Sequence, residues 1–273
     1  MAIYIMKPWY KKKGVELVPW STGTDEQIVA ILQAYYNNEL SAEEIQALKT
    51  TYFPVGAKRS IPISVMAATG VSESHHADNY EYVIIGQEHD DLNTAINGKR
   101  KALITVQQDR IFYKNTTDSS YSSNSPSTDD EGGYIDFTNE NGWDGSRRRE
   151  WCNNIYVAAL PQYIRENIKQ VKKLTSQGNG LATIITSVDK AFLVSEVELV
   201  NNFNNSYYGE GEQYAYFKTT TRKNPVKNSG NSAIWWLRSP ARYTTDEFCR
   251  RATSGVEGSM ASDASGICPA FCL

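Results

Sequence analysis

Ala233-Ile-Trp-Trp-Leu-Arg-Ser-Pro240 and Gly266-Ile-Cys-Pro-Ala-Phe-Cys-Leu273 are the two stretches that decide the fold of this chain. Both are apolar and aromatic, and they enclose a polar segment, residues 241–265, with few large apolar side chains. We expect both blocks to be core strands that hold the polar segment rigidly on a surface, where binding functions are common. The apolar ending at Phe271 predicts a buried strand in place of a frayed end.

Composition limits the classes of function. The chain has 273 residues and a net charge of −3. Its two short basic runs, Lys11–Lys13 and Arg147–Arg149, predict solvated faces and no nucleic-acid partner. No apolar run reaches transmembrane length, so membrane insertion is not expected. The first 20 residues lack the apolar core of a signal peptide, so we expect the protein to be made in the cytoplasm.

Two capping boxes predict helices near the start. In a capping box, the hydroxyl of a first residue and the side chain of a Glu or Gln three positions later each bond the backbone of the other. This spacing occurs twice, at Thr24 with Gln27 and at Ser41 with Glu44. The apolar residues after the first box recur at helical spacing; they are Ile28, Ile31, Leu32 and Tyr35. We therefore predict a helical assembly or attachment unit over residues 1–56 and a main domain over residues 57–273.

The main domain shows mixed patterns. Ile61, Ile63 and Val65 alternate with polar residues, which predicts a half-buried strand. Further strands are expected over 80–85, 102–106 and 191–200, helices over 148–160 and 162–175, and loops over 115–133 and 201–222. In the first helix, Trp151, Ile155 and Ala158 are expected to share a face. Together these elements predict an α+β domain.

Several blocks resemble a family of phage and gut-bacterial proteins that is described as a domain of unknown function with a "WLRSP" motif. They include 235–240, Phe248-Cys249, 266–273, 20–27, 64–70, 84–92, 146–151 and 192–197. That family resembles C-type-lectin-like folds, including the variable ligand-binding proteins of diversity-generating retroelements. It also resembles, distantly, the formylglycine-generating enzymes. The resemblance implies a C-type-lectin-like main domain, and it implies the fold more directly than the function.

Redox chemistry and metal binding are the enzymatic and cofactor alternatives. The formylglycine-generating relatives use a late pair of cysteines, but Cys268 and Cys272 lie in an apolar stretch, which predicts inert core thiols or a structural bridge. We expect no catalytic residue. His75, His76 and His89 are interpreted as surface or turn residues, with 88–91 a polar turn.

Calcium is not expected either. The calcium-binding strings of C-type lectins are missing from the sequence. The acidic residues Asp129, Asp130 and Glu131 lie in the predicted loop 115–133. We therefore predict no cofactor and no metal.

The apolar blocks supply five expected structural residues: Trp235, Trp236, Arg238, Phe248 and Phe271. An arginine among core residues must pair with a carboxylate or donate to carbonyl oxygens, so Arg238 is expected to tie the last strands to the domain.

The polar segment supplies the expected ligand contacts. Asn, Lys and Gln are all missing after residue 231, which is what adenine-directed diversification would leave, although chance composition remains an alternative. Arg and Tyr are effective contact residues on a rigid surface. The predicted ligand-binding residues are Arg242, Tyr243, Thr244, Thr245, Asp246, Arg250, Arg251, Thr253, Ser259, Met260, Ser262 and Asp263.

These observations predict a non-enzymatic, lectin-like ligand-binding protein: a phage or prophage tail or receptor-binding protein that adheres to a host. Its partners would be a bacterial cell-surface receptor and, through residues 1–56, a phage particle or another copy of itself. Its location would be the virion or, after release, the extracellular space. An oxidoreductase related to the formylglycine-generating enzymes and a purely structural virion decoration protein are the alternatives.

Overall fold

The computed structural model describes residues 14–64, 78–109, 136–218, 227–228, 231–232, 234–252, 254–263 and 265–273. The predicted loop 115–133 lies outside the described residues, as do Val65, His75, His76, Lys11–Lys13 and Asp129–Glu131. The chain combines helices with antiparallel sheets, and the described strands form no barrel.

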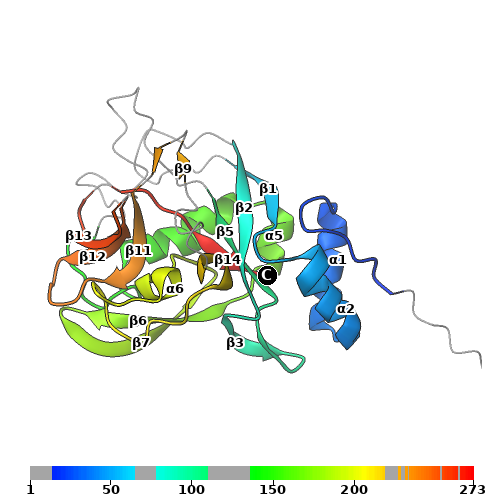
Figure 1. Cartoon of the computed structure of the whole chain (residues 1–273), viewed down its shortest axis with the longest axis horizontal. Coiled ribbons are helices and arrows are strands. Elements are labelled where there is room, and N and C mark those ends of the chain that lie inside the picture. Colours follow the sequence, from blue (N-terminus) through cyan, green and yellow to red (C-terminus); the bar gives the residue numbers. More distant parts are fainter. Residues whose placement is uncertain are drawn as a thin grey trace, which may run out of the picture.

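Both predicted N-terminal helices are confirmed. Helix α1 (Asp25–Tyr36) begins at Thr24 and α2 (Ala42–Ala47) begins at Ser41, each with a complete capping box. A π-helical turn, η1 (Leu48–Tyr52), continues α2. The predicted apolar stripe of α1 is buried. The helices lie together at one end of the molecule (Figure 1).

The final strand lies inside a five-stranded antiparallel sheet, as the apolar ending predicts. The sheet has the order β1 (Lys58–Ile63), β2 (Asp78–Gln87), β5 (Ile104–Gln108), β14 (Ala270–Cys272) and β8 (Ala191–Phe192). Tyr36 of α1 donates its hydroxyl to the carbonyl oxygen of Leu273 at 3.1 Å and accepts from the Leu103 amide at 3.0 Å. The N-terminal helices therefore share the hydrophobic core of the main domain.

A second sheet corrects one helix prediction. Its order is β4 (Lys99–Lys101), β3 (Asp91–Ile96), β6 (Val171–Gly178) and β7 (Leu181–Asp189). The helix expected over 162–175 ends early, because α5 covers only Gln162–Asn167. Val171, Lys173 and Thr175 are buried whereas Lys172 and Leu174 are exposed, which is the two-residue period of a strand. Pairing with β7 decides between the two periods.

The third sheet contains the polar segment. Its order is β11 (Trp235–Pro240), β12 (Glu247–Arg251) and β13 (Val256–Met260), and it lies at the end of the molecule opposite α1 and α2 (Figure 1). The segment is thus a pair of strands, not a free loop. A two-stranded ribbon, β9 (Lys227–Asn228) with β10 (Asn231–Ser232), completes the described strands.

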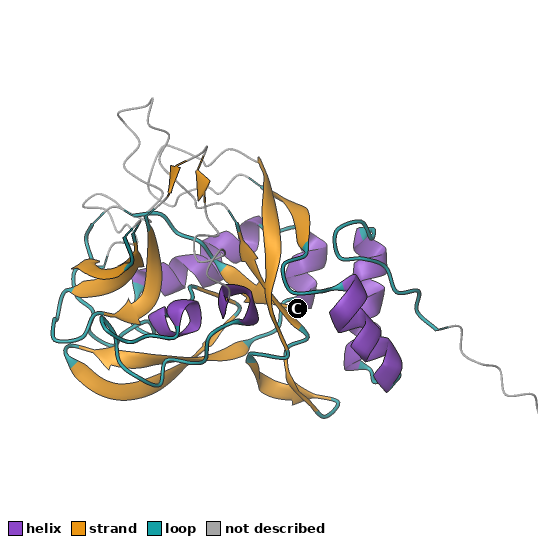
Figure 2. Ribbon diagram, in the orientation of Figure 1, coloured by secondary structure: helices purple, strands orange, loops and turns teal. Residues whose placement is uncertain are grey.

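The remaining helices differ in detail from expectation (Figure 2). The helix predicted over 148–160 is present as α3 (Arg147–Trp151), η2 (Cys152–Tyr156) and α4 (Val157–Ala159), but Ala158 is exposed and lies off the buried face. The strand predicted over 191–200 is present only as β8, Ala191–Phe192, and the prediction is wrong for the residues that follow. Ser195 and Glu198 form a capping box that begins α6 (Glu196–Val200). Within 201–222, η3 (Ala215–Lys218) is a short 3-10 helix. Across the described residues, no helix has the length and apolarity needed to cross a bilayer.

Candidate functional site

Lys173, a residue of β6, is the centre of a buried ionic network. Its Nζ atom lies 2.5 Å from Oδ1 of Asp90, 2.7 Å from Oε1 of Glu198 and 3.0 Å from the hydroxyl of Tyr214. An ammonium group has three protons, so these contacts use all of them. Both the Lys173 side chain and the two carboxylates are 2% exposed.

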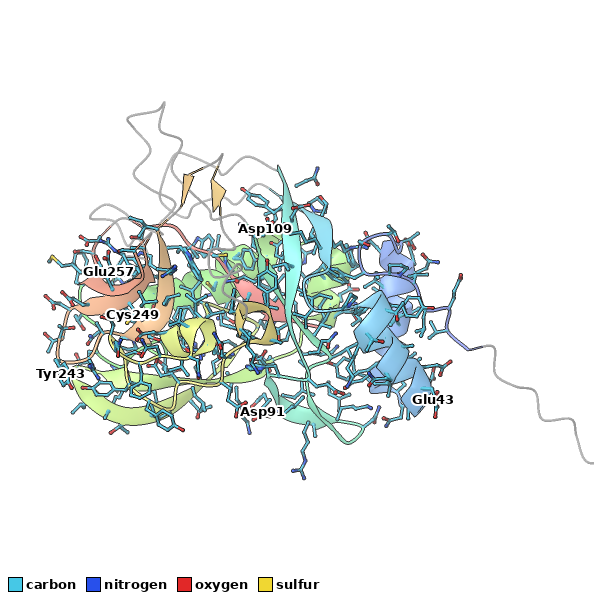
Figure 3. All side chains as sticks on the ribbon, viewed as in Figure 1. Glu43, Asp91, Asp109, Tyr243, Cys249 and Glu257 are labelled. Atoms are coloured by element: carbon cyan, nitrogen blue, oxygen red, sulfur yellow. The ribbon has the colours of Figure 1, made fainter. Side chains whose placement is uncertain are left out.

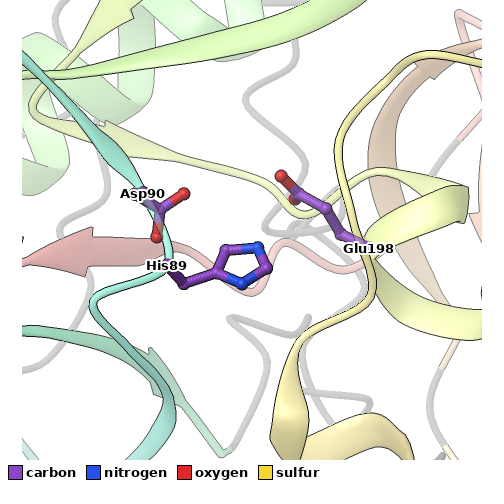
Figure 4. Close-up of side chains that lie close together, drawn as sticks. All are labelled: His89, Asp90 and Glu198. Carbon is purple, nitrogen blue, oxygen red and sulfur yellow. The ribbon is translucent and has the colours of Figure 1, made fainter. Parts of the chain in front are cut away.

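Two carboxylates of this network, Asp90 and Glu198, belong to a group of side chains that could hold a metal ion. Ligand atoms of His89, Asp90 and Glu198 lie within 4.8 Å of one another (Figure 4). However, the ammonium of Lys173 bonds both carboxylates, and the His89 ring lies against the Tyr214 ring with centroids 4.1 Å apart. The cation that these carboxylates hold is the chain's own lysine. The fit to a metal ion is therefore poor.

The two carboxylates of the network are ionised. Burial raises the pKa of Asp90, but the charge of Lys173 and its hydrogen bonds outweigh burial and hold that pKa well below its usual range. Burial also raises the pKa of Glu198, and Arg238 and Lys173 together bring it below its ordinary value. Residues 88–91 do form a polar bend between β2 and β3, as predicted. Asp90 in this bend is not on the surface, however: it is 4% exposed, because Lys173 and Tyr214 bond it.

Arg238 joins β11 to this network. It is fully buried and donates to both carboxylate oxygens of Glu198, at 2.5 and 2.8 Å. It also donates to the carbonyl oxygens of Leu174, Leu193 and Glu210. Pairing and carbonyl donation are both the contacts expected of a buried arginine. The other expected structural residues are buried too; they are Trp235, Trp236, Phe248 and Phe271.

One of the two basic runs is not a solvated face. Arg148 is 2% exposed, because it pairs with Asp136 at 2.7 Å and its guanidinium lies 4.1 Å from the centre of the Trp236 ring. No pattern in the sequence indicated that Asp136 would pair with Arg148. Burial lowers the pKa of Arg148 despite the opposing charge of Asp136.

The cysteines are free and buried. The thiol of Cys268 donates to the carbonyl oxygen of Gln108 at 2.8 Å, and Cys272 lies near Thr105. Burial raises the pKa of both thiols well above the ordinary value. Nucleophilic thiols need exposure and a lowered pKa, so these two have the environment of core residues.

The predicted ligand-binding residues divide by exposure. Tyr243, Thr245, Asp246, Met260 and Ser262 are exposed, whereas Arg242, Thr244, Arg250, Arg251 and Asp263 are half-buried. Ser259 is buried and donates its hydroxyl to Asp263, so it is less accessible than the other predicted contact residues. Thr253 lies outside the described residues.

Tyr243 is the most unusual of these residues. Its φ angle is +67°, in the left-handed region that bulky side chains avoid, and 78% of the residue is exposed. The Arg242 guanidinium lies 4.9 Å from the centre of its ring. Figure 3 shows Tyr243 at the edge of the molecule, at the end opposite Glu43 of α2. A strained backbone that holds an aromatic ring in solvent is a reason to suspect a binding role.

An aromatic loop, residues 201–209, lies beside Tyr243 and was not singled out by sequence. Its Tyr207 ring is 6.3 Å from the Tyr243 ring in an edge-to-face arrangement. Its Phe203 and Tyr208 rings are 5.5 Å apart and are 43% and 76% exposed. The signal was present, because Asn-Asn-Phe-Asn-Asn-Ser-Tyr-Tyr-Gly has the Tyr, Asn, Ser and Gly composition of antibody contact loops.

A buried carboxylate holds this aromatic loop in place. Glu196, 1% exposed, accepts from the amides of Asn205 and Ser206 at 3.1 and 2.8 Å. Asn205 in turn bonds the carbonyl oxygen of Val256 in β13 and accepts from the amide of Arg242. The aromatic loop and the Tyr243 turn are therefore fixed to each other and to the third sheet.

A polar hollow of about 420 Å³ lies elsewhere, beside α3 and the end of β7. Its Arg149 bonds Asp189 and Asp144, and its Asn153 bonds Asp189 and two backbone groups of residues 190 and 191. These central polar groups already satisfy one another, so the hollow is a weaker candidate than the aromatic surface.

Comparison with known proteins gives one match. A family model described as "Domain of unknown function (DUF6273)" covers residues 125–273, more than half of the chain. The chain belongs to this family. The description of the family names no activity, and the matched region contains β6 to β14 with both apolar blocks and the Tyr243 turn. No curated protein and no solved structure matches the chain.

Proposed function

We propose that this chain is a non-enzymatic, lectin-like protein that binds its ligand through one surface. That surface consists of the Tyr243 turn (residues 242–246), the aromatic loop and the half-buried or exposed side chains of β12 and β13. The observation that carries the proposal is the geometry of Tyr243: the residue is 78% exposed on a strained backbone, with the Arg242 guanidinium and the Tyr207 ring beside its own ring. Tyr and Arg are the side chains that most often dominate binding surfaces.

Preorganisation supports the same proposal. The aromatic loop and the Tyr243 turn are bonded through Asn205 and Glu196, so the contact residues lose little conformational freedom when a ligand binds. The favoured fold is C-type-lectin-like, in which a rigid sheet carries a variable contact surface. The alternative of an oxidoreductase related to the formylglycine-generating enzymes is less favoured, because Cys268 and Cys272 are buried with raised pKa values.

The proposed setting is a phage or prophage particle, with the chain as a variable protein of a diversity-generating retroelement. The contact surface and the N-terminal helices lie at opposite ends (Figure 3), which suits attachment at one end and a bacterial receptor at the other. Several copies on one particle would convert weak single contacts into avidity.

The test is binding of fluorescently labelled protein to a panel of intact bacteria. We expect binding to at least one strain, and we expect the double variant Tyr243→Ala with Arg250→Ala to lose it, since each anchor is worth roughly 2 kcal/mol or more. Glu43→Ala, an exposed change at the opposite end, is the matched control and should bind normally. EDTA should have no effect.

Two results would contradict the proposal. Binding that survives the double variant and disappears with EDTA would move the site to a metal-dependent surface. The lack of binding to any strain would favour the purely structural virion protein.

A further inference from the structure

The Lys173 network brings together the two reactants of an amide bond. The Nζ atom of Lys173 lies 2.5 Å from Oδ1 of Asp90, and both side chains are 2% exposed. An ammonium group and a carboxylate together contain the same atoms as an amide and one water molecule. In water the two ions are favoured because each is well solvated, whereas a dry core removes that solvation. This buried pair therefore has a covalent alternative that an exposed pair lacks.

Aromatic side chains form walls around the reacting atoms. Nζ of Lys173 lies 4.0 Å from the centre of the Phe192 ring and 5.4 Å from the centre of the Tyr214 ring. Both aromatic residues are fully buried. Walls of this kind exclude water, which favours the release of a water product and protects the resulting amide from hydrolysis.

Hydroxyl donors and a second carboxylate complete the site. Thr105 and Tyr214 both donate their hydroxyls to Oδ2 of Asp90, where the negative charge of a tetrahedral intermediate would lie. Oε1 of Glu198 lies 2.7 Å from Nζ of Lys173, which places this carboxylate to accept a proton from the attacking nitrogen. Ligand oxygens of Asp90 and Glu198 lie within 4.8 Å of each other (Figure 4).

We propose that Lys173 and Asp90 join in an isopeptide bond, with Glu198 as the catalytic base. A proton first passes from Nζ to Oδ1 along their hydrogen bond, which leaves a neutral amine and a carboxylic acid. Nζ then attacks Cγ of Asp90, and Oδ2 carries the negative charge. Glu198 takes a second proton from the nitrogen and returns it to Oδ1, which leaves as water while the C=O bond reforms at Oδ2. The third proton stays on the amide nitrogen, and Glu198 is again a carboxylate.

The charges and hydrogen bonds of the network fit the linked product. The ion pairs of the network join two cations and two carboxylates; they are Lys173, Arg238, Asp90 and Glu198. The bond removes one charge of each sign and leaves the pair of Arg238 with Glu198 complete. The new amide N–H faces Oε1 of Glu198, and the new carbonyl oxygen keeps both hydroxyl donors. The product therefore leaves no buried polar atom of the linkage without a partner.

The bond closes a loop between β6 and the bend that follows β2, across 83 positions of sequence. A cross-link of this length restricts the unfolded chain and so stabilises the fold. It does not depend on the proposed ligand or on the binding surface. In the linked chain Asp90 no longer titrates, whereas the unlinked chain keeps both carboxylates of the network.

Mass spectrometry of the intact, denatured protein is the first experiment. We expect the wild-type chain to be lighter than its sequence by one water molecule. Lys173→Arg and Asp90→Ala should have the full mass of their sequences, as should Glu198→Gln, which lacks the base. Lys172→Arg and Asp91→Ala, at exposed neighbouring positions, are the matched controls and should keep the loss of water. The wild-type mass decides the proposal even where a variant fails to fold.

Peptide mapping locates the bond. Trypsin should release one branched peptide in which Lys173 is joined to Asp90, because a linked lysine is not cleaved. A wild-type chain of full mass, with the two residues in separate peptides, would overturn the proposal and leave a simple ion pair. A loss of water at any other residue, such as a cyclised aspartate, would overturn it too. A folded Glu198→Gln variant that still links would exclude Glu198 as the base.

Discussion

The Nζ atom of Lys173 in β6 lies 2.5 Å from Oδ1 of Asp90, in the bend between β2 and β3, and both side chains are buried. These residues are 83 positions apart in the sequence. The pair shows how the fold places a cation between carboxylates that would otherwise repel. It also yields the first prediction.

Lys173→Met should destabilise the fold by about 3–5 kcal/mol, because removing one member of a buried ion pair leaves an uncompensated charge. Lys172→Met, on the same strand but exposed, is the matched control and should change stability by less than about 0.5 kcal/mol. Urea unfolding of both variants measures the difference. Equal stability of the two would mean that the network contributes nothing.

Glu210 should make stability depend on pH. Burial raises the pKa of this carboxyl to about 7 from its ordinary 4.5, although hydrogen bonds and Arg238 oppose the rise. The folded state therefore holds a proton that the unfolded chain loses, so the contribution of Glu210 to stability is greatest below about pH 4.5 and falls as pH rises from about 4.5 through 7. The expected loss is about 3 kcal/mol.

The check is chemical unfolding across this pH range. Glu210→Gln cannot ionise and should flatten the profile, whereas Glu212→Gln, at an exposed neighbour, should keep it. Asp90 and Glu198 have lowered pKa values, so their effect has the opposite sign: their contribution is lost as pH falls below about 4. A Glu210→Gln profile that still falls from pH 5 to 7 would assign the effect to another group.

The thiols of Cys268 and Cys272 should react slowly with an alkylating reagent at neutral pH in the native protein. Both are fully buried and have raised pKa values, so little thiolate is available. Mass spectrometry of native and urea-unfolded samples measures the contrast. Rapid native alkylation of either residue would favour the redox alternative.

Phe271→Ala should cost about 3–5 kcal/mol, the usual range for a buried phenylalanine in a core. Its strand lies between β5 and β8, so the cavity would lie inside the five-stranded sheet. Phe137→Ala, where the ring is 70% exposed, is the control and should be nearly neutral. A small effect at Phe271 would contradict the assignment of the final block to the core.

Tyr243→Gly should be more stable than Tyr243→Ala by about 1 kcal/mol, because only glycine adopts a positive φ without steric cost. Both variants lack the ring, so both should lose ligand binding. At exposed Thr245, which has no positive φ, the order should reverse, with alanine more stable than glycine. If alanine is more stable than glycine at both positions, Tyr243 is not strained.

The sequence by itself determined the features whose signals are local. Thr24 and Ser41 begin helices because a capping box satisfies backbone groups within one turn, and the apolar final block could only be core. The Tyr243 turn was also named from sequence, because polar residues between two apolar blocks must reach the surface.

Only the tertiary structure decided the features that depend on distant partners. Residues 171–175 fit both a helical and a strand period, and pairing with β7 selected the strand. Arg148 was expected on a solvated face, yet it is buried because Asp136 neutralises it, and Lys173 is buried because Asp90 and Glu198 bind its ammonium group. The aromatic loop joins Tyr243 through Glu196 and Asn205. A charge is stable in a core only when a partner meets it there, and one stretch of sequence does not show which distant residue that partner is.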